Sequence, residues 1–170
     1  MNDSAYDIIS LDQCNELFYA LDVPRDSKQY WRWHTERGFR YVDIDDVLGD
    51  SPLLLGQDWQ GDNRELYQSI PRQLERMGIE LMFNKTEGLS FVEISSLGRS
   101  TNCPTQDDTL EDLSKLISAI NELIKIHARY IAFANNEGAD THFYALFSND
   151  AWAEFLKNAP DLAHRYFRNF

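Results

Sequence analysis

The sequence predicts an α+β fold, with a mainly antiparallel sheet of four to six strands that is built from two hairpins and packed by helices. Two apolar strand–turn–strand patterns carry this prediction, because strands joined by short polar turns pair in the antiparallel direction. Amphipathic helical segments flank both patterns and supply the covering layer. The chain has 170 residues, 43% of them hydrophobic, so we expect one core and a single domain over 1–170.

The amino-terminal part predicts two helices. The first begins at a capping box formed by Ser10 and Gln13 and ends before Pro24. Its apolar face consists of Leu11, Cys14, Leu17, Phe18 and Leu21. A second helix is expected from Asp26 to Gly38.

The middle of the chain predicts a strand, a helix and the first hairpin. Residues 51–59, SPLLLGQDW, read as a short buried strand. The following helix has capping-box spacing at Asp62 and Glu65; Pro71 should kink or split it, and Gly78 should end it. The hairpin covers 79–96, with strands at 80–84 and 90–95. The polar segment 98–108, GRSTNCPTQDD, is expected to be an exposed loop.

The strongest helical pattern follows Thr109. Its apolar residues Leu110, Leu113, Ile117, Ile120 and Ile124 repeat at spacings of 3, 4, 3 and 4. This predicts a central helix against the sheet. A coiled-coil seam is the alternative, but the pattern extends over few residues and the apolar face is wide. The second hairpin covers 129–147, with strands at 130–134 and 142–147. Asn149 is expected to cap the next helix, and Pro160 to begin the last one.

The charge of the chain restricts its partners. It carries 28 acidic and 16 basic residues, a formal net charge of −12. Such a field repels nucleic-acid phosphates and anionic lipids, and it speeds association with basic proteins; plain solubility is the alternative explanation. Residues 1–23 contain five acids and no base, and residues 42–62 contain six acids and no base. Between them, 24–41 is basic and aromatic; the net charge favours a packed helix there over a single-stranded nucleic-acid site.

The stretch FRYVDIDDVLGD, residues 39–50, resembles the aspartate loop of haloacid-dehalogenase-type phosphatases. The resemblance implies that Asp43 is the nucleophile and Asp45 the general acid, at the end of a strand in a parallel, doubly wound sheet. Ser95 and Lys115 would supply the hydroxyl and the lysine of that family, and the SND at 148–150 is a poor substitute for its metal-binding acids. Because the following segments predict hairpins, we expect an acidic surface segment here instead.

Other catalytic and metal-binding patterns are missing. The histidines His34, His127, His142 and His164 are scattered, without an HxH or HExxH motif. The sequence has no GxSxG motif and no glycine-rich phosphate loop, and neither Cys14 nor Cys103 has a histidine nearby in sequence. We therefore expect no metal, no cofactor and no catalytic activity. No apolar run is long enough to span a membrane and the amino terminus lacks a secretory pattern, which predicts a cytoplasmic protein with reduced thiols.

The stretch LLLGQDWQGDNRELYQSI, residues 53–70, is similar to a motif in an uncharacterised family of small bacterial domains, where an apolar strand runs into Asp-Trp, an acidic turn and a helix. The matching residues are Asp58, Trp59, Asp62, Leu66 and Tyr67. The similarity extends, with gaps, to FYALFSNDAWAEFL near the carboxyl end. It implies a bacterial, cytoplasmic domain and names no reaction.

Together these features predict an acidic protein that binds and neutralises a basic protein partner, similar in character to immunity proteins of contact-dependent or polymorphic toxin systems. Toxin nucleases are basic because they bind phosphate, so an acidic inhibitor gains steering. The expected partner-binding residues are Asp43, Asp45, Asp46, Asp50, Asp58, Asp62 and, as an anchor, Trp59. For Trp59 the alternative is a residue at the edge of the core. A phage-type inhibitor or DNA mimic is the second hypothesis, and a phosphatase-like hydrolase using Asp43 and Asp45 is the third.

Overall fold

A computed structural model of the chain describes residues 11–24, 51–58, 63–105, 110–134 and 140–168. In these ranges the fold is α+β, as predicted, but the six strands form two antiparallel sheets of three strands rather than one sheet. The first sheet has the order β1 (Leu54–Asp58), β6 (Thr141–Ser148), β5 (Ala128–Ala132). The second has the order β2 (Leu81–Lys85), β3 (Phe91–Ser96), β4 (Arg99–Pro104).

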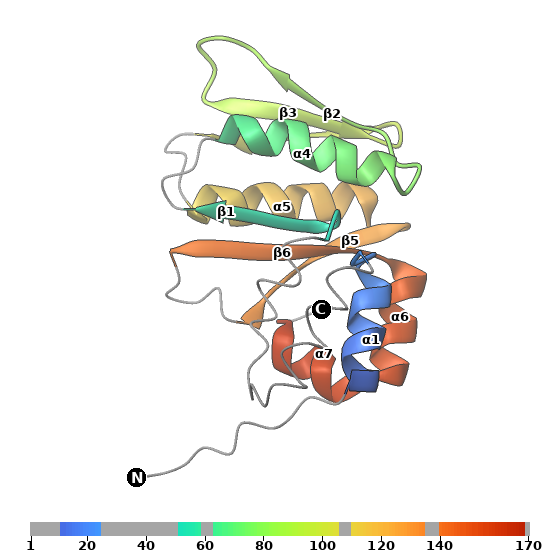
Figure 1. Ribbon diagram of the computed structural model, residues 1–170. Helices are drawn as coiled ribbons and strands as arrows, with labels where there is room; N and C mark the ends of the chain where they lie inside the picture. Colours follow the sequence, from blue (N-terminus) through green and yellow to red (C-terminus); the bar gives the residue numbers. More distant parts are fainter. Residues whose placement is uncertain (1–10, 25–50, 59–62, 106–109, 135–139, 169–170) are drawn as a thin grey trace.

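Helices lie between the two sheets and below the first one (Figure 1). The helix α4 (Asn63–Glu75) packs under β2, while α5 (Leu110–Ile124) contacts β3 and β4 of the second sheet and β5 of the first. On the other side of the first sheet lie α1 (Leu11–Ala20), α6 (Asn149–Asn158) and α7 (Pro160–Tyr166). The layers therefore alternate as sheet, helices, sheet, helices. The sheets stay separate because α4 and α5 fill the space between them.

Both predicted hairpins are confirmed. In the first, Phe83 of β2 lies opposite Ile94 of β3; in the second, Ile131 of β5 lies opposite Ala145 of β6. The strand predicted within 51–59 is β1, which pairs with β6 in antiparallel register. Among the described helices, none has the length and apolar character needed to cross a membrane.

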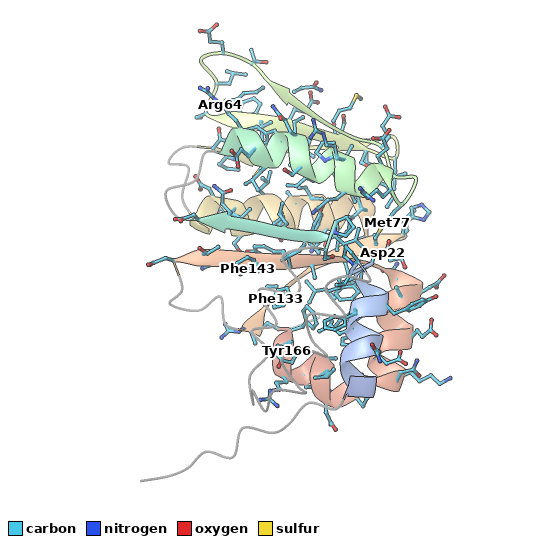
Figure 2. The ribbon with its side chains drawn as sticks, viewed as in Figure 1. Asp22, Arg64, Met77, Phe133, Phe143 and Tyr166 are labelled. Atoms are coloured by element: carbon cyan, nitrogen blue, oxygen red, sulfur yellow. The ribbon has the colours of Figure 1, made fainter. Side chains whose placement is uncertain are left out.

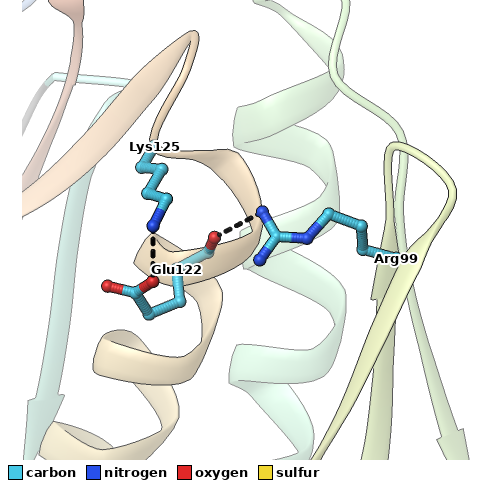
Figure 3. Close-up of polar contacts among 3 residues, drawn as sticks. All are labelled: Arg99, Glu122 and Lys125. Atoms are coloured by element: carbon cyan, nitrogen blue, oxygen red, sulfur yellow. Dashed lines mark hydrogen bonds and ion pairs between the residues drawn. The ribbon is translucent and has the colours of Figure 1, made fainter.

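The predicted loop at 98–108 is wrong over Arg99–Pro104, which form β4 antiparallel to β3. Leu97 and Gly98 both have positive φ, 53° and 73°, and form the two-residue type I′ turn that joins β3 to β4. The segment lacks the alternating apolar pattern that predicts a strand, because Cys103 is its one buried side chain. The Arg99 guanidinium also donates a 3.0 Å hydrogen bond to the Glu122 carbonyl of α5 (Figure 3).

Two expectations about helix ends also need correction. Of the two outcomes expected at Pro71, a kink or a split, the split is wrong, because α4 continues through Pro71 to Glu75. Gly78, at φ 72°, then ends the helix in a Schellman motif, in which its N–H donates to the Glu75 backbone carbonyl. The prediction that this glycine ends the helix is therefore confirmed. The cap of α6 is Ser148, not Asn149, because the Ser148 hydroxyl accepts the Ala151 N–H at 3.1 Å.

The predicted helix at 26–38 lies outside the described residues. For the first helix, Leu17, Phe18 and Leu21 are fully buried, as the apolar pattern predicted. Below the first sheet, stacked and edge-on aromatic rings fill the core, with centroids 4.8–6.4 Å apart; Figure 2 marks two of them, Phe133 and Phe143.

Candidate functional site

Most of the predicted partner-binding residues lie outside the described ranges. These are Asp43, Asp45, Asp46, Asp50, Trp59 and Asp62. Asp58 is described: it is the last residue of β1, is exposed, and lies opposite Thr141 of β6.

The structure brings the end of the first acidic segment, 1–23, beside the middle of the second, 42–62. The Ser51 hydroxyl donates a hydrogen bond to the Leu21 carbonyl at the end of α1, and Ser51 directly follows Asp50 in the sequence. The second acidic segment therefore enters β1 beside Asp22. Asp58 lies at the other end of this five-residue strand, at least about 13 Å from Leu54 at roughly 3.3 Å per residue. Asp58 and Asp22 thus belong to different parts of the surface.

A groove of about 360 Å³ lies where α1 and α6 meet the start of β1. Its apolar side is formed by Leu53, Met77 and Phe155, and Tyr19 stands at its rim with 74% of its surface exposed. Three carboxylates line it, those of Glu16, Asp22 and Glu154, and no lysine or arginine is among the described lining residues. Figure 2 shows Asp22 and Met77 at the same end of the molecule, where β1 begins. We call this the acidic groove.

The backbone at Asp22 is unusual for a helix end. Asp22 has φ 52°, and the Val23 N–H donates to the Phe18 carbonyl at 2.9 Å, so α1 ends in a Schellman motif with an aspartate where glycine is preferred. A side chain in this conformation costs about 1 kcal/mol. The last turn of α1 also contains no base. Asp22 therefore adds a negative charge to the negative end of the helix dipole, a combination that is locally unfavourable.

Neighbouring helices position the other carboxylates. Glu16 lies on α1, and its carboxylate accepts a 3.3 Å hydrogen bond from the side-chain amide of Asn158 on α6. Glu154 is an exposed residue of α6, about one turn before the end of that helix. The amino end of α6 also borders the groove, and there Ser148 satisfies the Ala151 N–H. The arrangement suits a cation with an apolar stem.

The cysteine and histidines of the described part form no reactive cluster. Cys103 is buried, and burial, followed by the nearby Asp112 carboxylate, raises the pKa of its thiol, which disfavours the nucleophilic thiolate. No group of three His, Cys, Asp or Glu side chains within the described ranges could hold a metal ion. The side chain of Cys14 is outside those described.

The residues considered for the phosphatase interpretation are not brought together where they are described. The buried residues Val92, Ile94 and Ser96 of β3 face α5. Ser95 alternates with them, so it lies on the other face of the second sheet, which points away from α5. Lys115 is on α5 itself. Asp43 and Asp45 lie outside the described ranges, and all described strand pairs are antiparallel, whereas that family has a parallel sheet.

No protein-family model, curated protein or solved structure matches this chain. The resemblances drawn from the sequence accordingly stay predictions. Sequence reasoning missed the acidic groove, because Glu16 and Asp22 lie on α1 and in the turn after it, whereas Glu154 lies on α6, more than a hundred residues later in the chain. The signal that could have pointed to it is Tyr19, an aromatic residue outside the apolar face of the first helix.

Proposed function

We propose that this protein binds and neutralises a basic protein partner, as an immunity protein against a bacterial toxin does. The acidic groove carries the proposal: three carboxylates, an exposed tyrosine and an apolar wall stand together without a described base. A lysine or arginine of the partner can lay its stem on Leu53 and Met77 and bring its charge to the carboxylates. The Tyr19 ring offers such a cation a π face.

The wider charge distribution supports the same proposal. Half of the 28 acidic residues lie outside the described side chains, and six of these fourteen belong to the segment 25–50, which joins the described chain next to the groove residues Asp22 and Leu53. A basic toxin nuclease would be steered toward this end of the molecule, and the steering would weaken as salt screens it. Asp43, Asp45, Asp46 and Asp50 remain proposed contacts, with Trp59 as a proposed anchor. Location in the cytoplasm also remains a prediction.

Asp22 supports the proposal because it lowers the stability of the fold at a position where glycine would be more favourable. Glycine at this position would relieve the strained φ and remove a charge from the wrong end of the helix dipole. We therefore expect Asp22→Gly to leave stability unchanged or raise it by about 1 kcal/mol, while it slows association with the partner. Gains in stability combined with losses in binding are expected of a functional residue and not of a structural one.

The experiment first identifies the partner by affinity capture from the source organism and then measures binding kinetics with the purified partner over a salt series. The test variant carries Glu16→Gln, Asp22→Asn and Glu154→Gln. The control variant carries Glu65→Gln, Glu80→Gln and Glu87→Gln, three exposed acids that do not line the groove, with the same change in net charge. We expect the test variant to associate more slowly than the control and to show a weaker salt dependence.

The toxin interpretation has its own readout. Co-expression of the chain with a captured toxin should restore growth, and the test variant should restore it less well than the control variant. Capture of a DNA-binding host protein would instead favour an inhibitor that mimics DNA. Association rates that respond neither to salt nor to the three groove substitutions would contradict the proposal.

A further inference from the structure

The edge strand β2 of the second sheet presents unpaired backbone groups. The type I′ turn at Leu97 and Gly98 makes Ser96 and Arg99 a hydrogen-bonded pair. Every second residue of β3 then bonds to β4, and the 3.0 Å hydrogen bond from the Thr105 N–H to the Ser90 carbonyl fits this alternation. The intervening residues of β3 therefore turn their peptide groups toward β2. They are Phe91, Glu93 and Ser95.

This alternation determines which peptide groups of β2 point outward. Met82 and Asn84 lie opposite Ser95 and Glu93, so the backbone N–H and C=O groups of Met82 and Asn84 bond to β3. The N–H and C=O groups of the other β2 residues, Leu81, Phe83 and Lys85, point away from the sheet. No described residue bonds to these outward groups. They form a template for one more strand.

In the first sheet, the outward backbone groups of the edge strand β5 are already hydrogen-bonded to a side chain and to a residue near the carboxyl end of the chain. Along β5, the side chain of Asn121 accepts the Tyr130 N–H at 2.7 Å and donates to the Tyr130 carbonyl at 2.8 Å. The Arg168 N–H donates to the Ala132 carbonyl at 2.9 Å. An additional strand cannot bond there without displacing these groups.

The other two edges are partly blocked or polar. On β1, the side-chain amide of Gln73 donates to the Leu54 carbonyl at 2.8 Å. On β4, the outward positions are Ser100, Asn102 and Pro104, and proline has no N–H to contribute. The edge of β2 has neither a proline nor a side-chain cap among the described contacts, and Met82 on this strand is 51% exposed.

We propose that β2 pairs in antiparallel register with β2 of a second copy of this chain, centred on Phe83. Phe83 would face Phe83, and Leu81 would face Lys85, which gives three hydrogen-bonded pairs and about six backbone hydrogen bonds. The two second sheets then join into one continuous sheet of six strands across a two-fold axis. The inference is separate from the proposed function, because this edge does not include the acidic groove.

A second copy fits this edge because the charge around it is balanced. From Arg64 to Arg129 the sequence has ten acids and eight bases, so this part of the chain carries little of the net charge of −12, and two copies can meet here with little repulsion. Exposed apolar side chains are also concentrated on this sheet: besides Met82, Leu89 and Leu97 in its turns are 45% and 43% exposed. A strongly basic or acidic partner would find no complementary charge here.

Sedimentation velocity of the full chain over a concentration series tests the pairing, together with amide hydrogen exchange. We expect a dimer that forms with rising concentration, and a concentration-dependent slowing of exchange at Leu81, Phe83 and Lys85. Lys85→Pro removes an outward N–H and should abolish the dimer. The matched control is Asn102→Pro, the same change at an outward position of β4, which should leave the dimer intact.

Disulfide trapping tests the register without relying on proline. In the proposed dimer Met82 of one copy is directly opposite Asn84 of the other in a non-hydrogen-bonded pair, where two cysteines can bridge. Met82→Cys with Asn84→Cys should give a covalent dimer on oxidation, and Ser100→Cys with Asn102→Cys should not. A chain that stays monomeric throughout, a dimer that instead protects the amides of Ser100 and Asn102, or a dimer unchanged by Lys85→Pro would each overturn the proposal.

Discussion

Replacement of Gln73 by methionine should destabilise the fold strongly, although the two side chains have similar size. Gln73 is a buried residue of α4, and its amide joins two sheet strands. Its nitrogen donates to the Leu54 carbonyl of β1 at 2.8 Å, and its oxygen accepts the Tyr130 hydroxyl of β5 at 2.8 Å. Methionine fills the space but leaves that carbonyl and that hydroxyl without their partner.

The expected cost follows from these two contacts. A buried polar group that loses its partner costs about 1–3 kcal/mol, and the gain from burying an apolar side chain offsets part of it, so we expect a loss of about 2–4 kcal/mol for Gln73→Met. For a domain of this size that corresponds to a fall in Tm of roughly 5–15 °C. In a Tyr130→Phe background the hydroxyl is already gone, and the cost of Gln73→Met should shrink by about 1–2 kcal/mol.

Urea unfolding with a shared m value measures these free energies. The control is Gln68→Met, the same change at an exposed position of α4, which should stay within about 0.5 kcal/mol of the unchanged chain. Gln73→Met no more destabilising than this control would refute the reasoning, as would additive effects of Gln73→Met and Tyr130→Phe.

Two further predictions concern the β3–β4 turn and alkaline pH. Leu97→Asn should raise the free energy of unfolding by about 0.5–1 kcal/mol, because asparagine tolerates the positive φ that leucine adopts at the cost of strain; equal or lower stability in urea would contradict this. Burial raises the pKa of Tyr130 above its ordinary value of 10.0, so the folded chain keeps a proton that the unfolded chain releases. The contribution of Tyr130 to stability should therefore be constant below about pH 10 and be lost as the pH rises above it, and Tyr130→Phe should make the alkaline fall in stability shallower in urea titrations, even though it lowers stability at neutral pH. An identical alkaline slope in both proteins would be inconsistent with a buried Tyr130 proton.

The sequence by itself determined the elements whose signals are local. The spacing of Leu113, Ile117 and Ile120 predicted α5 because one face of a helix repeats about every 3.6 residues, and all three side chains are buried. Both hairpins followed from apolar strands around short polar turns, since such turns bring neighbouring segments into contact. The excess of acids, on which the proposed kind of partner rests, also needed only composition.

The tertiary structure alone decided how those elements combine. The strand β4 carries one buried side chain, so its identity depends on β3 beside it and α5 beneath it rather than on its own pattern. The acidic groove joins α1 to α6, which are more than a hundred residues apart, and the Gln73 contacts join α4 to both edges of the first sheet. Two sheets form instead of one because α4 and α5 bury apolar faces between them. Such choices rest on packing between distant segments, and no local spacing in the chain encodes them.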